Sequence, residues 1–317
     1  MTGSRGRKTL RRLRALHDGG TSLIVGSELR FVTLVATVVI AIGPGCFNRS
    51  PSGAGRTAGP ASKEGPTDQA PLYVPPPKQE KPFVLELAPG VTMEFVWIPP
   101  GSFTMGDPKE GIPRHKETIS RPFYLAKTEV TQQQWTVVLG KDKNPSLLKG
   151  AQYPVHRVNW EDCQAFIKAL NEKYVHTGMR FSLPTEVEWE YACRAGHAVK
   201  LDTPDDPAKI EEYAWLGSNS QYEPHPVAQK KPNAWGLFDM QGNVAEWCAD
   251  ELRPGPDGRI PGLPPEAQEP SSNEPWYVVR GGNYREGPAA CTSTSRYIRR
   301  AFVPLRHDGL RPMCVPR

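Results

Sequence analysis

The chain reads Leu183-Pro-Thr-Glu-Val-Glu-Trp-Glu-Tyr191 near its middle, and this stretch predicts the start of a helix. Thr185 and Glu188 have the spacing of a capping box, in which each side chain accepts a hydrogen bond from the backbone N–H of the other residue. The helix is expected to continue to Cys193 and to stop at Gly196, because glycine tolerates the left-handed conformation that ends helices.

Two more helices are expected on the N-terminal side of this one. The sequence Thr131-Gln-Gln-Gln134 is another capping box, and Gly140 closes the helix that follows it. Asn159 caps a helix over residues 160–170, whose apolar side chains recur on one face. That face holds Cys163, Phe166, Ile167 and Leu170.

Short strands and loops account for the rest of the folded part. Residues 92–98, 103–106 and 123–126 have the composition of short strands. No long helical period follows residue 200, and the Pro- and Gly-rich residues 252–275 predict a long surface loop. The pattern indicates an α+β fold that is loop-rich and has few helices.

The composition excludes two classes of protein. With 38% hydrophobic and 23% charged residues, the 317-residue chain is not a fully disordered protein. Residues 1–46 hold seven of the 39 Lys and Arg and two of the 34 Asp and Glu, so they carry the whole net charge of +5. The rest of the chain is neutral, and its composition does not suggest the basic face that a nucleic-acid partner would need.

Residues 1–46 resemble an export leader. A basic region precedes Phe31–Gly43, thirteen residues without a charge, whereas a spanning helix needs ~20. Cys46 follows small residues as in the lipobox of bacterial lipoproteins, which implies acylation of Cys46, although Gly43 stands where leucine is usual. Plain secretion and an uncleaved anchor are the alternatives. We expect an exported, membrane-anchored lipoprotein of the periplasm or cell envelope.

Residues 47–82 predict a tether between this anchor and a folded domain. They hold eight Pro and four Gly in 36 residues, with almost no large apolar side chains. Such a segment cannot bury enough surface to offset the entropy cost of ordering it. The folded domain is expected over residues 83–317, where the helix and strand signals lie.

Eight motifs follow one another in the folded part. They are Phe103-Thr-Met-Gly106, Glu129-Val-Thr131, Pro154-Val-His-Arg-Val-Asn-Trp160, Leu183-Pro-Thr-Glu-Val-Glu-Trp-Glu-Tyr191, Asn233-Ala-Trp-Gly-Leu-Phe-Asp-Met240, Gly242-Asn-Val-Ala-Glu-Trp247, Arg280-Gly-Gly282 and Gly309-Leu-Arg311. In this order they resemble the sulfatase-modifying factor family, whose type member is the formylglycine-generating enzyme. The resemblance covers residues 88–316 and implies a modified C-type-lectin-like fold.

The resemblance also implies a copper site of which this chain has half. The formylglycine-generating enzyme oxidises a peptide cysteine with oxygen. It binds Cu(I) through two cysteines that follow an Arg-Gly-Gly motif. Here those two positions are Glu286 and Cys291, while Asn283 and Ala245 replace a serine and a tryptophan of the family's active site. Soft thiolates select Cu(I), so copper is not expected, and catalysis at Cys291 and Glu286 would need a non-standard site.

For other metals, the resemblance predicts calcium and not iron. No two of the seven histidines have the His-x-x-x-His-x-Glu spacing of the ergothioneine-type relatives. Asp239, Gly242, Val244 and Glu246 match a Ca²⁺-binding segment of the family. Two carboxylates and two backbone carbonyls are the kind of oxygen ligands that Ca²⁺ prefers. The alternative is that Asp239 and Glu246 only cap turns.

Five cysteines remain besides Cys46, and an exported compartment permits disulfides. The resemblance implies a bond between the helix that holds Cys163 and the chain end that holds Cys314. Cys193 is either free or joined to Cys291, because Arg296 occupies the position of its family partner.

Three arginines and two tryptophans have two interpretations each. Arg280, Arg296 and Arg311 match family arginines. They either bind an anion or peptide in a cleft or, as we favour, pair with the glutamates of the helix quoted first. Trp215 and Trp276 either pack in the core, as we favour, or form a sugar-binding platform.

These observations predict an exported protein of the sulfatase-modifying factor family that binds or scaffolds without copper. Its ligand would be a peptide, a protein or a carbohydrate, and it would contact the membrane through its N-terminal lipid or leader. The alternative is an oxidoreductase of the formylglycine-generating type, acting on a peptide or small molecule through Glu286 and Cys291.

Overall fold

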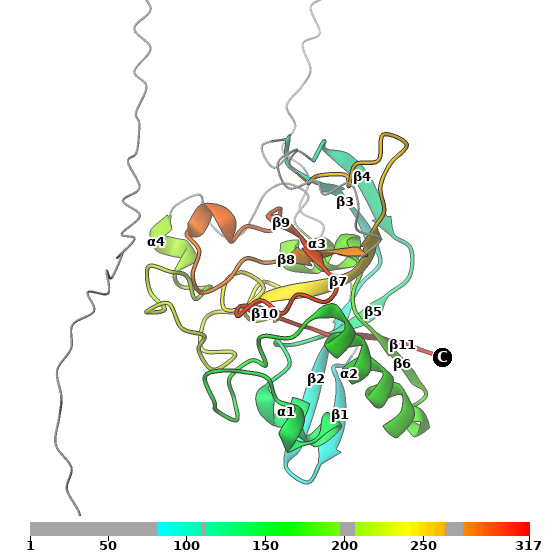
Figure 1. Cartoon of the computed structure of the whole chain (residues 1–317). Helices are drawn as coiled ribbons and strands as arrows, with labels where there is room; N and C mark the ends of the chain where they lie inside the picture. Colours follow the sequence, from blue (N-terminus) through cyan, green and yellow to red (C-terminus); the bar gives the residue numbers. More distant parts are fainter. Residues whose placement is uncertain (1–80, 109–111, 197–206, 264–274) are drawn as a thin grey trace, which may run out of the picture. The chain divides into compact units, whose positions relative to one another are not determined.

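The computed structural model describes residues 81–108, 112–196, 207–263 and 275–317, all within one compact unit, Pro66–Arg317 (Figure 1). The predicted leader, with Cys46, and nearly all of the predicted tether lie outside the described residues. Within the described residues, no helix is both long and apolar enough to cross a bilayer.

A five-stranded antiparallel sheet forms one half of the domain. Its strand order is β1-β2-β5-β11-β6, so β11, near the end of the chain, lies between two strands that precede it by more than 100 residues. The predicted strands 92–98 and 123–126 are confirmed as β2 and β5. The bounds are β1 Phe83–Ala88, β2 Val91–Ile98, β5 Phe123–Ala126, β6 Met179–Ser182 and β11 Met313–Pro316.

A four-stranded sheet and a separate hairpin complete the β structure. The sheet has the order β10-β7-β8-β9, in which β10 runs parallel to β7 and the other pairs are antiparallel. The predicted strand at 103–106 lies in β3, which pairs with β4. The bounds are β3 Gly101–Met105, β4 His115–Ile119, β7 Ala245–Leu252, β8 Trp276–Arg280, β9 Arg296–Arg300 and β10 Asp308–Gly309.

The three predicted helices are confirmed, together with their caps. They are α1 Gln132–Leu139, α2 Trp160–Lys173 and α3 Glu186–Arg194, and a short α4 spans Pro207–Ile210. In α3, the Thr185 side chain accepts from the Glu188 backbone N–H at 3.2 Å, and the Thr185 N–H donates to the Glu188 carboxylate at 2.8 Å. The helix continues to Arg194, one residue past Cys193, and its C-cap is Ala195 and not Gly196; Ala195 adopts the left-handed conformation with φ 49°.

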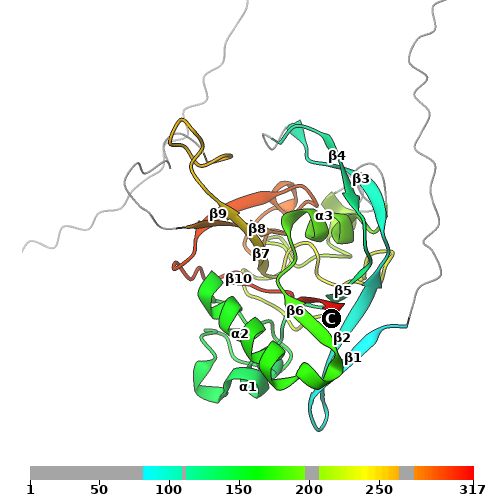
Figure 2. The ribbon, with the colours of Figure 1, turned by 90° about the vertical axis from the view of Figure 1, so that its right-hand side faces the viewer.

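The tryptophans of the motifs lie in two hydrophobic cores. In the first, α1 and α2 lie side by side with α2 along β6 (Figure 2), and Trp135 stacks on Phe166 with ring centroids 5.2 Å apart. In the second, α3 places Trp189 beneath the hairpin and the end of β8. Among the described residues, the members of the two cores extend from Leu85 to Cys314.

Buried ion pairs fasten α3 to the four-stranded sheet. Arg280, fully buried in β8, contacts the carboxylate of Glu190 and lies 3.5 Å from that of Glu186. Arg194 pairs with Glu190 at 2.7 Å, and Arg296 pairs with Glu186 at 2.7 Å. The favoured interpretation is therefore confirmed for Arg280 and Arg296.

Arg311 differs from that expectation, because its partner is Glu246 of β7 at 2.7 Å and not a glutamate of α3. The reason is topological. Arg311 comes just before β11 and just after β10, and β10 pairs in parallel with the start of β7, where Glu246 lies.

We expect Glu190→Ala to lower the free energy of unfolding by about 3–5 kcal/mol, because it removes the carboxylate that two buried guanidinium groups share. Urea unfolding of the variant and the wild type measures this. The matched control is Glu172→Ala, whose exposed pair with Lys168 spans 3.9 Å and is worth at most about 0.5 kcal/mol. Equal losses in the two variants would contradict the prediction.

Candidate functional site

Two glycines shape the loop that carries the predicted catalytic positions. Gly281 and Gly282 follow β8 with φ of 95° and 70°, a conformation that L side chains rarely adopt. A Cβ on Gly282 would lie 2.5 Å from the Cys291 sulfur and from the Ala290 carbonyl oxygen. The chain therefore folds back on itself here, which brings Cys291 against the Arg-Gly-Gly turn.

Cys291 is a buried thiol rather than an exposed one. It packs against Leu216 and Ala214, and its sulfur lies 3.6 Å from the backbone oxygen of Asn283. Burial, and next the charge of Glu286, raise its pKa to about 12. At neutral pH the thiol is therefore protonated and is a poor metal ligand.

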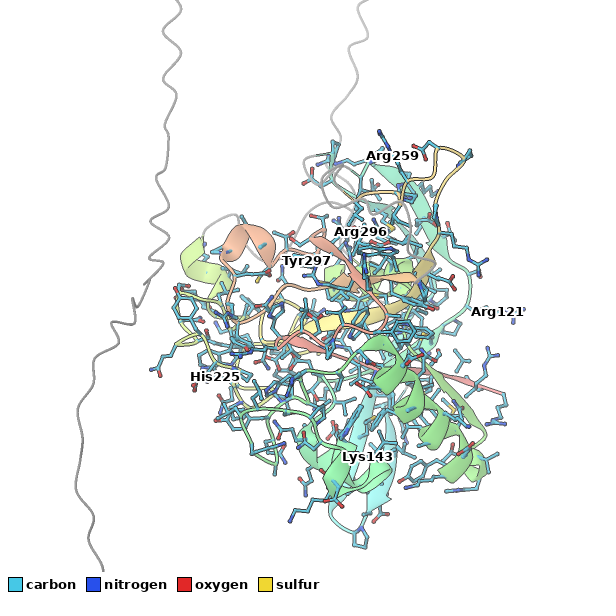
Figure 3. All side chains as sticks on the ribbon, viewed as in Figure 1. Arg121, Lys143, His225, Arg259, Arg296 and Tyr297 are labelled. Atoms are coloured by element: carbon cyan, nitrogen blue, oxygen red, sulfur yellow. The ribbon has the colours of Figure 1, made fainter. Side chains whose placement is uncertain are left out.

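Glu286 is held by a hydroxyl group. The Tyr297 hydroxyl lies 2.7 Å from the Glu286 carboxylate and 2.9 Å from the Ala290 carbonyl oxygen, so one phenolic proton faces two acceptors. Burial, and then Glu286, raise the pKa of Tyr297, which keeps the phenol protonated. Figure 3 labels Tyr297 beside Arg296, both on β9. Tyr297 was not singled out in the sequence, because its contact with Glu286 depends on how the loop returns to β9.

A second carboxylate in this region also escaped the sequence analysis. Asp308 in β10 is fully buried, and neither of its carboxylate oxygens has a hydrogen-bond partner. The Arg299 Nε lies 3.9 Å from one oxygen, and the His307 Nε2 lies 3.8 Å from the other. Both separations exceed hydrogen-bond length. Asp308 therefore stands in the interior as an unsatisfied acceptor.

Burial is the main cause of the shifted pKa values of Asp308 and its neighbour His307. It raises the pKa of Asp308 to about 7, with Glu286 adding to the rise and Arg299 opposing it. It lowers the pKa of His307 to about 4, and Arg299 and Arg285 lower it further. At neutral pH, His307 is uncharged, and Asp308 is present in both its protonated and its ionised form.

The residues at the family's copper positions do not fit Cu(I). They offer one protonated, buried thiol and one carboxylate that a tyrosine hydroxyl already holds. Cu(I) prefers soft thiolate ligands, and a carboxylate is a hard one. In the part of the chain that the structure describes, no three His, Cys, Asp or Glu side chains gather as a metal-binding group.

The predicted calcium segment forms part of a buried acidic cluster. Glu246 has both carboxylate oxygens on Arg311, at 2.9 and 3.0 Å from its Nε, and it also accepts from the Trp189 indole at 2.6 Å. Asp239 accepts from the Ala228 backbone through one oxygen, at 2.7 Å, while its other oxygen is buried without a partner. Asp239 therefore fits a cation, whereas Glu246 is already committed.

Glu129 is the third carboxylate of this cluster. It is fully buried and accepts from the Val244 backbone N–H at 2.9 Å and from the Asn243 side chain at 2.8 Å. Burial, then Asp239 and Glu246, raise its pKa well above the ordinary value. Burial likewise raises the pKa of Asp239 to about 6. The cluster holds three carboxylates against the single guanidinium of Arg311, an excess that protons or a cation must balance.

The five cysteines of the described residues are free thiols in the structure. The Cys163–Cys314 bond that the resemblance implied is not formed, and of the two alternatives for Cys193, a free thiol or a bond to Cys291, the structure has the free thiol. Cys193 and Cys291 belong to different hydrophobic clusters, which is the physical reason that they do not meet. Cys163 and Cys314 lie in the same core, but each packs there as a buried apolar side chain.

The two candidate sugar platforms have other side chains on their rings. Trp215 stacks on His225, with ring centroids 3.7 Å apart and an angle of 9° between the rings, and the Lys230 ammonium lies 4.0 Å from the Trp215 ring centre. Figure 3 labels His225 on the side of the domain away from β11. The Arg300 guanidinium lies 5.1 Å above the ring of Trp276. These contacts favour the structural interpretation of both tryptophans.

Two cavities of the described part lie on other elements than the Glu286 loop. A polar groove of ≈ 280 Å³ runs beside β2 and the start of α1, lined by residues that include Thr92, Gln133 and Gln152. A small cavity of ≈ 40 Å³ lies between α3 and the acidic cluster, with Cys193 and Asp239 in its wall. Asp239, whose other oxygen has no partner among the described residues, is thus one of the residues that line this cavity.

Comparison with known proteins finds one family. A family model described as the sulfatase-modifying factor enzyme 1-like domain matches residues 86–314. The chain is 31% identical to the chaperone protein LppX of Paenibacillus barcinonensis, over 42% of this chain and 64% of that protein. It is 31% identical to the formylglycine-generating enzyme of Streptomyces coelicolor, over 50% of each. The chain therefore spans less than two thirds of the length of these relatives.

Solved structures show the same fold. Treponema denticola variable protein 1 matches with a TM-score of 0.62 and 26% identity, over 76% of this chain and 100% of that one. PvdO from Pseudomonas aeruginosa matches with a TM-score of 0.60 and 26% identity, over 74% and 99%. With few helices and mostly curled sheets and loops, the domain has the predicted modified C-type-lectin-like fold.

We expect Asp308→Asn to stabilise the domain increasingly as pH rises. The folded-state pKa of about 7 lies above the ordinary 3.8, so the folded chain binds this proton more tightly than the unfolded chain. The free energy of unfolding therefore falls as pH rises from about 4 to about 7, by up to ~4 kcal/mol at about 1.4 kcal/mol per pKa unit. An amide removes this loss.

Urea unfolding of both proteins at several pH values measures the effect as the difference between them. The difference cancels the contribution of His307, whose lowered pKa acts with the opposite sign below about pH 6.5. A stability difference that stays constant from about pH 4 to about pH 8 would refute the buried, proton-exchanging state of Asp308.

Proposed function

The chain belongs to the family of the sulfatase-modifying factor enzyme 1-like domain, and from that premise we propose that it is an exported binding or scaffold module that works without copper. The observation that carries the proposal is which two residues stand at the family's copper positions and what holds each of them. Glu286 stands at one of them with Tyr297 on its carboxylate, and the thiol at the other is buried and protonated. The fold is kept while the metal ligands are not.

A protein or peptide is the ligand class that the relatives favour. The Paenibacillus relative is named a chaperone protein. Other relatives are named formylglycine-generating enzyme, which is the type member of the family and acts on a peptide. The stacked rings of Trp215 and Trp276 give less support to a carbohydrate, because protein side chains already lie against them. We therefore propose a peptide segment of another protein as the ligand.

Export and anchoring belong to the same proposal. The uncharged segment Phe31–Gly43 and the lipobox-like Cys46 support a lipid anchor, and the Pro-rich residues 47–82 support a tether. A binding domain on a membrane tether needs no catalytic centre of its own.

The second candidate is an oxidoreductase with a non-standard site. It is favoured by the relatives named formylglycine-generating enzyme and by Cys291, which the chain retains next to Glu286. It requires that ligand binding expose and ionise a thiol whose pKa is now about 12.

We expect no formylglycine from a Cys-x-Pro-x-Arg peptide, even with copper, reductant and oxygen supplied, because a single thiol cannot make the Cu(I) pair. Mass spectrometry of the peptide detects the aldehyde. Glu286→Cys restores the pair and should raise Cu(I) affinity by at least tenfold in a chelator competition, while Glu286→Gln is the matched control. Aldehyde formation that Cys291→Ser abolishes would contradict the proposal and support the oxidoreductase.

A structural Ca²⁺ at Asp239 remains a proposal, and it makes a pH-dependent prediction. Ca²⁺ binds the ionised carboxylate, and the pKa of Asp239 is about 6, so Ca²⁺ should raise the melting temperature more at pH 8 than at pH 5. At a hundredfold excess over Kd the gain is about 2.7 kcal/mol. Thermal unfolding with calcium or chelator measures it.

The control for this experiment is a second carboxylate that should have no part in the site. Asp239→Asn should abolish the calcium response, whereas Asp257→Asn, on the exposed loop after β7, should keep it. A wild-type melting temperature that is equal in calcium and in chelator at pH 8 would rule out the site.

A further inference from the structure

We propose that an extended peptide with acidic side chains binds along helix α1, in two adjoining grooves that share Gln133 as a lining residue. The proposal rests on the proposed function for the choice of a peptide as the ligand, and it adds the surface and the charge of that peptide. The surface is formed by the start of β2, by α1 and by the loop that follows α1 as far as Gln152.

Two grooves lie along α1. The first is the polar groove of ≈ 280 Å³ beside β2, and Gln133 and Gln152 line it. The second has ≈ 490 Å³, and Gln133, Val137 and Ala151 line it. Because Gln133 borders both grooves and Ala151 directly precedes Gln152, the two form one track. The eight residues of α1 span about 12 Å, which is the length of about four residues of an extended peptide.

The loop beside the second groove is fixed in place by one buried side chain. Gln132 Oε1 accepts from Asn144 Nδ2 at 3.0 Å and from the Gly150 backbone N–H at 3.3 Å. Gln132 Nε2 donates to the backbone oxygens of Leu148, at 2.9 Å, and Pro154, at 3.3 Å. A groove with a wall held in this way loses little conformational entropy when a ligand binds, which favours affinity.

Two side-chain amides where the grooves adjoin use only half of their hydrogen-bonding capacity on each other. Gln152 Nε2 donates to Gln133 Oε1 at 3.1 Å. Among the described residues these side chains have no other partner, so Gln133 Nε2 is left as a donor and Gln152 Oε1 as an acceptor. A peptide group has one C=O and one N–H and is therefore complementary to this pair.

Two lysines line the second groove, and no acidic residue lines it. Lys149 Nζ donates to the backbone oxygen of Asn144 at 2.9 Å. Within the part of the chain that the structure describes, neither Lys141 nor Lys149 has a carboxylate partner, and both are exposed. Their ammonium groups are therefore complementary to acidic side chains of a ligand.

The acidic residues near this surface each have a lysine of their own. Glu94 lines the first groove and pairs with Lys127 at 2.8 Å. Asp142 is exposed between Lys141 and Lys143 in the chain and lines neither groove. Figure 3 labels Lys143 beside α1. The positive charge of the second groove is therefore not cancelled by these two carboxylates.

The combination of features favours a peptide over a small anion. An anion such as phosphate would use only the two lysines. A peptide also uses the free donor and acceptor of Gln133 and Gln152, and it places an apolar side chain against half-buried Val137 and the apolar stems of Lys141 and Lys149.

The test uses the full-length protein in detergent and a labelled peptide, Ser-Glu-Leu-Glu-Val-Glu-Ser, whose binding is followed by fluorescence anisotropy. We expect saturable binding. Replacing the three glutamates of the peptide by glutamines should weaken binding about fivefold, because two exposed charge pairs are lost. Methylating the backbone nitrogens of the peptide should also weaken it about fivefold, because the N–H that faces Gln152 is removed.

Variants of the protein locate the site. Lys141→Gln with Lys149→Gln should weaken binding about fivefold, and Lys141→Gln alone, which removes no contact within the described residues, about twofold. The matched control is Lys116→Gln with Arg180→Gln, which removes two exposed charges on β4 and β6 and should change binding by less than twofold. The basic leader is identical in all of these proteins, so it does not contribute to the differences.

Three results would overturn the proposal. They are an equal loss in the groove and control variants, equal binding of the glutamate and glutamine peptides, and displacement of the peptide by inorganic phosphate at the same concentration of charge. Absence of peptide binding in a protein that makes no formylglycine contradicts the groove alone. Formylglycine formation from the Cys-x-Pro-x-Arg peptide contradicts the proposed function, whatever the groove binds.

Discussion

One buried ion pair, between Arg311 and Glu246, joins the two sheets of the domain. Both side chains are fully buried, with 2.7 Å between them. Arg311 also donates to the backbone oxygens of Ala126 in β5, at 2.9 Å, and of Phe238, at 2.8 Å. Trp189 of α3 donates to the same carboxylate. Since a buried charge that loses its partner costs several kcal/mol, this pair ties β5, β7 and α3 into one arrangement.

The same pair creates the acidic cluster beside it. Arg311 can neutralise one carboxylate. Burial, then Asp239 and Glu246, raise the pKa of Glu129, and burial together with Glu246 raises the pKa of Asp239. A protein that keeps such a cluster must supply protons or a cation to it. Asp239 has an unpartnered carboxylate oxygen and is also one of the residues that line the small cavity near α3.

The family's fold and its chemistry separate cleanly in this chain. The fold depends on buried pairs such as Arg280 with Glu190, which are retained. The copper positions lie on the loop after β8, where the hydroxyl of Tyr297 accommodates a glutamate at 286. A change there leaves the framework intact, and function must therefore be argued from the loop and not from the fold.

The sequence by itself determined the features whose partners lie within a few residues, such as the caps at Thr131, Asn159 and Thr185, and the ordered motifs identified the family and its fold. It did not determine the partner of Arg311 or the state of Asp308. Those depend on β10 pairing in parallel with β7, a strand distant in the chain. Burial and charge pairing of this kind arise only when the sheets assemble, because they belong to neighbours in space and not to neighbours in sequence.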